Sequence, residues 1–323
     1  MITRRKILGA LTTLATMATL VSPAWADYPE RPISMIVAAA PGGGTDIMAR
    51  TMVPFMEKYL NGATISVINK PGAGTEIGAT ALAKAKPDGY TIGMTNLPHM
   101  IAIPIERKAA FHMLESFEPL ANLVTDAAAF NVSENSPFAT LDDLATYARE
   151  NPGKLTVGTS GIGGDDHLAM LMFEKVAGIK MTHVPFASGA PVRAALMGGH
   201  IDVGAFNISE AIDFVKEGKL RTLGIMDNKR WEQAPDVPTF KEQGYDVIIA
   251  AHRGMAAPKG VPADRLELLR MSIEKTMADP EFQAKAAEQK LPLNYLPHDE
   301  YLVLLQNMDK SMRTLWDEDP WKQ

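Results

Sequence analysis

The sequence contains no cysteine, and its 323 residues carry fewer basic than acidic side chains, 32 against 38. The absence of cysteine excludes disulfide bonds and thiolate metal sites. A net charge of −6 argues against a nucleic-acid-binding protein, because such proteins present a basic face to the phosphates. Beyond the first 26 residues, no apolar run approaches the roughly 20 residues that a membrane-spanning helix needs. With 46% apolar residues, the chain is still able to bury one large core or two medium ones.

The first 26 residues have the pattern of a secretory signal peptide. A basic start, Arg4-Arg5-Lys6, precedes a moderately apolar run over residues 7–21, and Ala24-Trp25-Ala26 forms a cleavage site of small residues. The paired arginines also resemble a twin-arginine signal, so ordinary secretion and export of the folded protein both stay open. Removing this segment makes the remaining chain more acidic. We therefore expect an exported protein that is located in the periplasm.

Short apolar strands alternate with helices along the rest of the chain, which predicts an α/β fold with parallel strands joined by helical crossovers. A length near 300 residues favours two domains. Thr140 and Asp143 are spaced as a helix cap followed by an acid at the third helical position. The last 60 residues are expected to be helical, including Asp299–Trp316. The other predicted helices lie at about 46–60, 76–85, 165–177 and 190–197, and the predicted strands are Ile33–Ala38, Thr64–Asn69, Tyr90–Thr95, Leu155–Thr159, Met181–Val184, Asp202–Phe206, Leu220–Met226 and Val247–Ala251.

Glycine-rich turns repeat between these strands and helices. Residues 41–46 and 71–76 share the pattern Pro-Gly-x-Gly-Thr-acid, thirty positions apart, and Gly158–Gly164 is a third turn of this kind. Unpaired backbone N–H groups and the helix dipole make such a helix start an anion site. The alternative is plain turn chemistry, with Thr45 and Thr75 as ordinary N-caps. Three such turns, all at the same strand ends of parallel sheets, favour a ligand cleft. The acidic side chains beside the turns would repel a phosphate dianion, so they favour a carboxylate as the ligand.

Other chemistry-bearing patterns are sparse. The seven histidines show neither an i, i+4 pair nor a metal-binding motif, and no catalytic serine elbow or phosphate-binding loop of the Walker type occurs. We therefore expect no catalytic residue, no metal and no cofactor. Gly72-Ala73-Gly74 resembles part of a dinucleotide fingerprint, which leaves an exported, cofactor-carrying oxidoreductase as the alternative. The 19 methionines are expected to fill the core.

Ten short motifs lie along nearly the whole chain after the leader. They are Tyr28–Ile33, Pro41–Asp46, Pro71–Gly74, Lys86–Thr91, Asn151–Leu155, His167-Leu168, His183–Phe186, Gly198–Val203, Pro235–Thr239 and Ala257–Pro262. Each motif is weak alone, and together they are specific. In this order they resemble the substrate receptors of tripartite tricarboxylate transporters, also called the Bug family.

This resemblance implies a type II periplasmic binding protein, with two α/β lobes of parallel-rich sheets and a ligand cleft between them. The first lobe would combine residues 27–124 and 248–323, and the second would span 125–247. The implied function is capture of a small mono-, di- or aromatic carboxylate by lobe closure and its delivery to membrane transporter subunits. A receptor that serves a sensor kinase is a further alternative. A monomer that binds no nucleic acid is expected.

The resemblance also implies a set of ligand-binding residues. Four of them, Gly43, Gly44, Thr45 and Asp46, would form the cradle of the first lobe, with Thr95 and Asn96 nearby. The second lobe would contribute Ser160, Gly161, Ser188, Gly189 and Ala190, with Asp202 and Asn207 at the cleft floor.

Several positions depart from the family pattern. Phe186-Ala187 stands where Tyr-Lys is usual, Asn207 replaces a frequent Asp, and Thr75-Glu76 replaces a frequent Gly-Asn. Arg253 falls where an aromatic residue is common. It is therefore expected to be either a fork for a second carboxylate or a solvated hinge residue.

Overall fold

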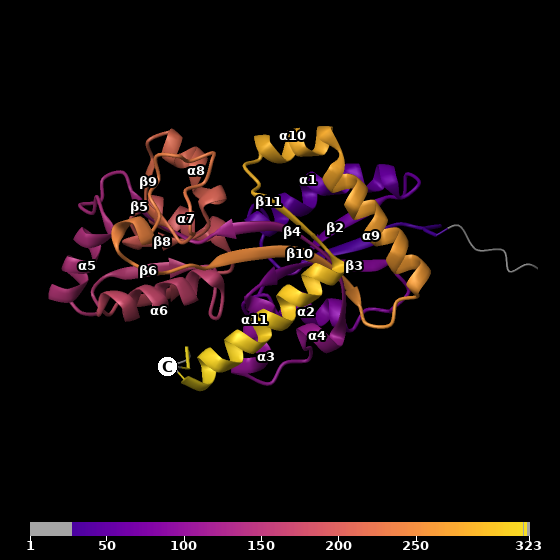
Figure 1. Cartoon of the computed structure of the whole chain (residues 1–323), viewed down its shortest axis with the longest axis horizontal. Helices are drawn as coiled ribbons and strands as arrows, with labels where there is room; N and C mark the ends of the chain where they lie inside the picture. Colours follow the sequence, from indigo (N-terminus) through magenta and orange to yellow (C-terminus); the bar gives the residue numbers. More distant parts are fainter. Residues whose placement is uncertain (1–27, 319, 322–323) are drawn as a thin grey trace, which may run out of the picture.

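The computed structural model describes residues 28–318 and 320–321, so the predicted signal peptide at 1–26 lies outside the described residues. Two separate β-sheets organise the chain, and Figure 1 shows them side by side with helices packed around each. We call the elements packed on the six-stranded sheet lobe 1 and those packed on the five-stranded sheet lobe 2. No helix in residues 28–318 and 320–321 is long and apolar enough to cross a membrane. The predicted α/β architecture with two sheets that contain parallel strands is confirmed.

The sheet of lobe 1 is mixed and has the strand order β11-β4-β10-β3-β1-β2. The first three strands of the chain are parallel, as the sequence predicts, and β10 then pairs antiparallel with both β3 and β4. The strands of this sheet are β1 (Ile33–Val37), β2 (Ile65–Asn69), β3 (Thr91–Leu97), β4 (Phe117–Ala127), β10 (Ala250–Pro258) and β11 (Leu293–Pro297). Its helices are α1 (Gly44–Tyr59), α2 (Glu76–Ala83), α3 (His99–Glu106), α4 (Met113–Ser116), α9 (Ala263–Ala278), α10 (Pro280–Glu288) and α11 (His298–Glu318).

Lobe 2 has the strand order β7-β6-β8-β5-β9, in which β6 is parallel to β7 and β8 while β5 is antiparallel to β8 and β9. The strands are β5 (Ala129–Ser133), β6 (Thr156–Thr159), β7 (Thr182–Pro185), β8 (Val203–Ala205) and β9 (Leu220–Ile225). The helices are α5 (Leu141–Glu150), α6 (Asp165–Ala177), α7 (Gly189–Met197), α8 (Ile208–Lys216) and the short 3-10 helix η1 (Lys241–Gln243). The predicted cap of α5 is confirmed, because Thr140 and Asp143 bond each other's backbone N–H groups.

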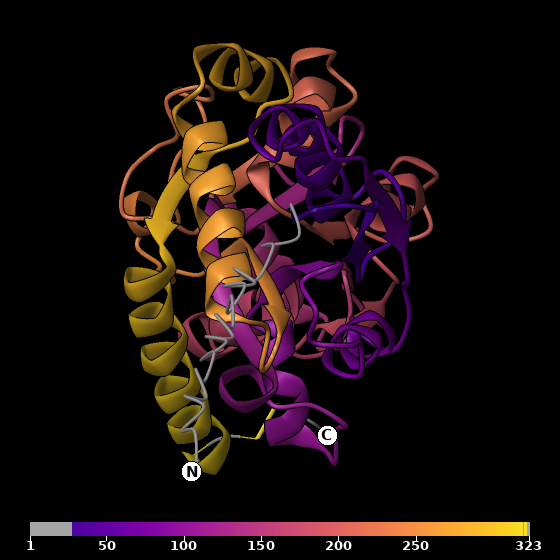
Figure 2. The ribbon, with the colours of Figure 1, turned by 90° about the vertical axis from the view of Figure 1, so that its right-hand side faces the viewer.

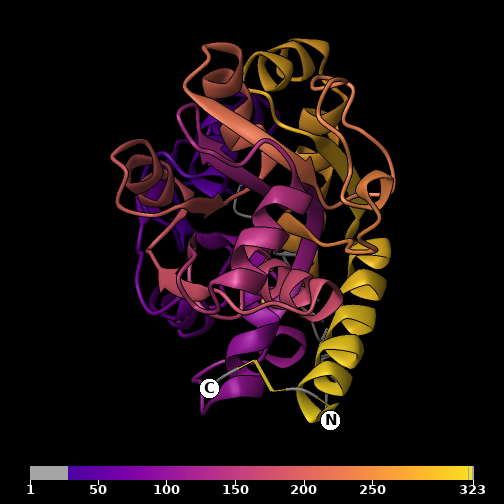
Figure 3. The same cartoon turned by 90° about the vertical axis from the view of Figure 1, so that its left-hand side faces the viewer.

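Of the two strands that connect the lobes, the sequence did not predict β4 and predicted only the start of β10. β4 runs without a helix almost directly into β5, and the chain returns through β10, which begins at Ala250 rather than at the predicted Val247. β4 is buried almost throughout and lacks the polar alternation of a half-exposed strand. The expectation of a wholly helical C-terminal part is also wrong, because β11 separates α10 from α11. Figures 2 and 3 show α11 extending along one flank of the molecule.

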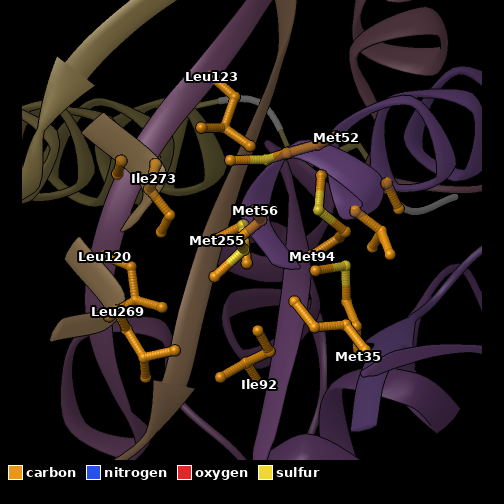
Figure 4. Packing of buried hydrophobic residues seen from close by; sticks show 14 of the residues in the cluster. Met35, Met52, Met56, Ile92, Met94, Leu120, Leu123, Met255, Leu269 and Ile273 are labelled. Atoms are coloured by element: carbon orange, nitrogen blue, oxygen red, sulfur yellow. The ribbon is translucent and has the colours of Figure 1, made fainter. Parts of the chain in front are cut away.

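Methionine fills much of the core of lobe 1, as predicted. Met35, Met52, Met56, Met94 and Met255 are almost fully buried, and Figure 4 shows their side chains meeting between the sheet and the neighbouring helices. The flexible thioether chains fill gaps of irregular shape between β-branched and leucine side chains. This packing holds the N-terminal end of α1, which reaches the cleft, at a fixed place on the sheet.

Aromatic packing anchors α6 in lobe 2. Phe173 is fully buried, and its ring meets those of Phe130, Phe240 and Tyr245 at centroid distances of 5.4, 5.5 and 5.0 Å. These contacts are close to edge-to-face, which is the favourable arrangement of aromatic quadrupoles. The first turn of α6 lies at the cleft between the lobes, so the cluster positions that turn.

We expect Phe173→Ala to lower the free energy of unfolding by about 3–5 kcal/mol, because it removes buried aromatic surface and leaves a cavity. Urea titration measures this change. Phe173→Leu keeps most of the volume and should cost less, and it serves as the folded variant if the alanine variant does not fold. Val303→Ala, at a side chain that is 54% exposed, is the control and should change the midpoint little. Equal effects of Phe173→Ala and Val303→Ala would contradict this account of how α6 is held.

Candidate functional site

Three glycine-rich or serine-containing turns meet at a small cavity between the lobes. Gly43 precedes α1, Thr75 precedes α2 and Ser188 precedes α7, and none of the three helix starts has a side-chain cap. Thr45 lies inside α1, and Thr75 is the N-cap residue of α2 but its side chain bonds no helix amide, so the expectation that both are ordinary N-caps is wrong. The cavity has a volume of about 30 Å³ and is lined by Ala38, Ala39, Gly43, Gly44, Thr45, Thr75, Asn96, His99, Ser160, Ala187, Ser188, Gly189, Glu210 and Arg253.

Seven buried polar atoms of these lining residues have no hydrogen-bond partner in the part of the chain that the structure describes. They are Thr75 Oγ1, Asn96 Oδ1, both ring nitrogens of His99, Ser188 Oγ, Glu210 Oε2 and Arg253 Nε. An unpaired buried polar group costs about 1–3 kcal/mol, so folded proteins rarely collect several in one place. Donors and acceptors from both lobes are thus available to a polar ligand.

A second cavity, of about 470 Å³, is larger but does not have this character. It lies beside α5 and α6, and Leu168, Leu171, Met172, Leu315 and Trp321 make much of its wall apolar. None of the seven unpaired atoms lines it. We therefore place the candidate site at the small cavity, where the polar groups converge.

Arg253 forms the centre of a buried polar network at this site. Its side chain is 2% exposed, and it donates to Asp126 Oδ2 at 2.5 Å, to Asn207 Oδ1 at 2.7 Å and to Glu210 Oε1 at 3.1 Å. The expectation that Arg253 is a solvated hinge residue is therefore wrong. β10 changes register against β4 between Arg253 and Gly254, and such an irregularity re-aims a side chain. Only Nε of the guanidinium is left without a partner among the described residues.

Glu210 joins the two lobes through a backbone amide. The N–H of Gly44, at the start of α1 in lobe 1, donates to Glu210 Oε1 of α8 in lobe 2 at 3.0 Å. The side chains of Arg253 and Glu210 lie so close to the backbone of Gly44 and Gly189 that neither position has room for a Cβ. A Cβ on Gly44 would lie 2.6 Å from the guanidinium carbon of Arg253, and a Cβ on Gly189 would lie 2.2 Å from Glu210 Oε2. A carboxylate of the protein itself therefore occupies the helix start that the sequence predicts to hold an anion.

Buried carboxyl groups surround this pair. Burial raises the pKa of Asp165 to about 6, although the Asn207 side chain and the charge of Arg253 act in the opposite direction. Burial, together with the charge of Asp165, raises the pKa of Asp166 well above its usual value. Burial also raises the pKa of Glu210 against the opposing charge of Arg253. The site is therefore rich in acids that resist ionisation.

The histidines at the cleft are neutral near pH 7. Burial lowers the pKa of His99 to about 4, against the opposing effect of the Ser160 backbone, and lowers that of His183 to about 4 as well. Burial and the neighbouring His183 lower the pKa of His167 to about 3, and these two rings are stacked at a centroid distance of 4.1 Å. Each neutral imidazole offers one donor and one acceptor.

The structure brings eight of the residues expected at the site to the cavity wall. They are Gly43, Gly44, Thr45, Asn96, Ser160, Ser188, Gly189 and Arg253. Asn207 lies behind the wall, where it holds Arg253 and Asp165. The assignment of these residues to a ligand stays a prediction, which the cavity motivates.

Besides Asn207, five further expected residues do not line the cavity. Asp46 accepts hydrogen bonds from Arg50 and Asn69, and the Thr95 hydroxyl bonds that of Tyr301. Gly161 and Ala190 adjoin the lining residues without reaching the wall. Asp202 accepts from Thr156, at the far end of the strand that leads to Ser160, so its prediction as part of the cleft floor is wrong.

The sequence analysis did not include three polar residues of the wall, Thr75, His99 and Glu210, among the ligand-binding residues. Glu210 lies three residues after the N-cap of α8, a position where acids are common for purely local reasons. No spacing in the sequence distinguishes it. His99 opens α3 directly after β3, so only its position at the end of a strand gave a signal.

We expect Asp165→Asn to become more stable relative to the wild type as the pH rises from about 4.5 to 7. Between its unfolded pKa near 3.8 and its folded pKa of about 6, the folded protein retains a proton that the unfolded chain releases, so this carboxyl lowers stability with rising pH. The asparagine variant cannot release this proton, so its stability does not fall in this way as the pH rises. The buried histidines have the opposite dependence in both proteins, so the difference between the proteins is the quantity to measure.

Urea titrations at pH 4.5 and 7 give that difference. Asp213→Asn, at an exposed position of α8, is the control and should follow the wild type at both values. A difference between wild type and Asp165→Asn that stays constant, or that changes in favour of the wild type, would show that Asp165 is not held protonated by burial.

The chain is similar to known proteins over most of its length. Residues 48–318 match the model of the tripartite tricarboxylate transporter family receptor. The UPF0065 protein in the gbd 5'region of Cupriavidus necator is 30% identical over 295 residues, which cover 91% of this chain and 89% of that protein. The solved periplasmic binding protein BugD is 30% identical, with a TM-score of 0.84 over 90% of this chain and 98% of its own. MatC from Rhodopseudomonas palustris, solved with bound malate, is 26% identical, with a TM-score of 0.82 over 89% of this chain and 99% of its own. The chain belongs to the family of tripartite tricarboxylate transporter receptors.

Proposed function

We propose that this receptor binds a small solute bearing a carboxylate in the cavity between its lobes and releases it to the membrane subunits of a tripartite transporter. The observation that carries the proposal is the set of unpaired polar atoms from both lobes that converge on one cavity. The bound malate of MatC supports a carboxylate as the ligand's anchoring group. Thr75 and Ser188 supply hydroxyl donors, and Arg253 Nε supplies a charged one.

Lobe closure is the proposed mechanism of capture. A cavity of about 30 Å³ has the volume of roughly one water molecule, so a solute enters only when the lobes separate. A ligand that contacts groups of both lobes favours the closed arrangement by the difference between its affinities for the closed and open states. The closed rims then form the surface that membrane subunits recognise.

Several finer statements belong to the same proposal. We propose a boundary between the lobes near residues 124–125 and 247–248, an exported protein whose leader at 1–26 is removed, and a monomer that binds its solute without converting it chemically. The acidic net charge of −6 supports the absence of a nucleic-acid partner. The exported oxidoreductase is disfavoured by the match of residues 48–318 to a family of transporter receptors.

We expect Ser188→Ala to weaken binding of the cognate solute about tenfold without lowering the melting temperature of the empty protein, since its hydroxyl has no partner to lose within the described residues. A thermal-shift screen of mono-, di- and aromatic carboxylates identifies the solute, because a ligand that binds only the folded state raises the melting temperature. Calorimetric titration then compares the variant with the wild type. Ser66→Ala, at an exposed position of β2, is the matched control. Unchanged affinity in Ser188→Ala would remove the cavity from consideration as the binding site.

A further inference from the structure

The larger cavity, of about 470 Å³, is separate from the candidate site, because the described residues that line the two cavities are all different. Its walls come from two parts of the molecule. Helices α5 and α6 of lobe 2 form one side, and Leu315 of α11 together with Trp321 forms the other, where the end of α11 approaches α6 (Figure 1). Pockets for small molecules have volumes of roughly 300–1,000 Å³, so this cavity is large enough to hold one.

Much of the cavity wall is apolar and firmly held. Leu168 and Leu171 of α6 pack in the same hydrophobic cluster as Trp321. The indole Nε1 of Trp321 donates to Glu106 Oε2 at 3.3 Å, and its ring meets that of Trp316 close to edge-to-face at a centroid distance of 4.6 Å. These contacts fix the indole in the wall. Covering apolar surface removes it from water, which is favourable, so the cavity suits a ligand with an apolar body.

The charged residues of the wall are mostly basic. Three of them, Arg149, Lys175 and Lys180, are cations, and Glu174 is the one acid among the described lining residues. The carboxylate of Glu174 is already bonded, since Lys180 Nζ lies 3.2 Å from its Oε2 and the Met181 N–H donates to its Oε1. The wall is therefore a locally basic surface in a chain whose net charge is −6.

Arg149 is placed to hold an anionic group at the edge of the cavity. Its Nη2 donates to the backbone oxygen of Ala177, the last residue of α6, at 3.3 Å. A guanidinium carries five N–H donors, so this bond leaves others for a ligand. Lys180 adds a second cation, with a side chain that is 66% exposed. An anionic group bound at these exposed residues keeps contact with water, so it avoids the large desolvation cost of a buried ion pair.

We propose that this cavity is a second binding site, which takes an amphipathic anion with one charged head and an apolar body, as in a medium-chain fatty acid. The apolar body lies against Leu168, Leu171 and Trp321, and the head lies at Arg149 and Lys180. A molecule with a charge at each end fits poorly, because its second charge would be buried against apolar side chains without a partner. The inference concerns a site apart from the cleft and does not rest on the proposed function.

Decanoate is the probe that tests this site, in calorimetric titrations of the full exported chain. We expect decanoate to bind, and octanoate to bind about tenfold more weakly because it buries two fewer methylene groups. Decylammonium, which has the same apolar body and the opposite charge, should bind at least tenfold more weakly than decanoate. The inference is overturned if decanoate does not bind, if chain length has no effect, or if decylammonium binds as tightly.

Two variants place the probe in the cavity. Leu171→Glu introduces a charge into the apolar wall and should weaken decanoate about tenfold or more, whereas Val176→Glu, at an exposed position of the same helix outside the wall, is the matched control. If Leu171→Glu does not fold, Arg149→Glu reverses a charge at an exposed position and should also weaken decanoate about tenfold. Lys154→Glu, at an exposed position that does not line the cavity, is its control. Equal affinities in a folded variant and its control would contradict the proposal.

Ser188→Ala distinguishes the two cavities. Its hydroxyl belongs to the small cavity, so the variant should bind decanoate as the wild type does. A loss in Ser188→Ala as large as that in Arg149→Glu would place decanoate in the cleft and overturn the second site. The proposed function is tested separately with short carboxylates, so the failure of either proposal leaves the other standing.

Discussion

The buried guanidinium of Arg253 is the interaction on which the cleft depends. It lies in β10 of lobe 1, and it bonds Asp126 of β4 together with Asn207 and Glu210 of lobe 2. Removing a cation and its partners from water is costly, and only well-formed hydrogen bonds offset that cost. Asp126 meets this requirement because it also accepts from the backbone and hydroxyl of Ser209, which fixes the start of α8. One side chain therefore determines where a helix of lobe 2 begins relative to a strand of lobe 1.

This arrangement explains the glycines at the cleft more fully than turn geometry does. Gly44 and Gly189 have ordinary negative φ, so no left-handed backbone requires them. They are required because the side chains of Arg253 and Glu210 fill the space that a Cβ would need. The sequence analysis treated such glycines as places where a ligand approaches the backbone. In the structure, the group that approaches is first of all a carboxylate of the protein, and the acidic net charge no longer conflicts with an anion at a helix start.

The predictable part of the molecule was the part with local signals. Alternating strands and helices, the glycine turns and the capped start of α5 follow from patterns that span a few residues, and the structure has each of them. β4 was not predictable by the same means, since its polar residues Asn122 and Asp126 are buried to serve contacts that are distant in sequence. The sequence analysis missed Glu210 for the same reason, because the contact of Glu210 with Arg253 forms only when β10 lies beside α8. Asp202 shows the converse case, in which a residue near the correct strand lies at the wrong end of it.

In the proposed mechanism, lobe closure and ligand binding would both involve the carboxyl group of Glu210. One oxygen of Glu210 bonds Gly44 of the other lobe and so holds the two lobes together without a solute, while the second oxygen has no hydrogen-bond partner among the described residues. A solute shifts the balance between open and closed states only by what it adds to this existing contact. A group that satisfies the second oxygen adds to closure, whereas a group that competes for Gly44 must first replace an interaction of similar strength. In the proposed mechanism, the bond between the lobes would therefore itself discriminate between solutes, since it penalises those that would bind where the protein already supplies the anion.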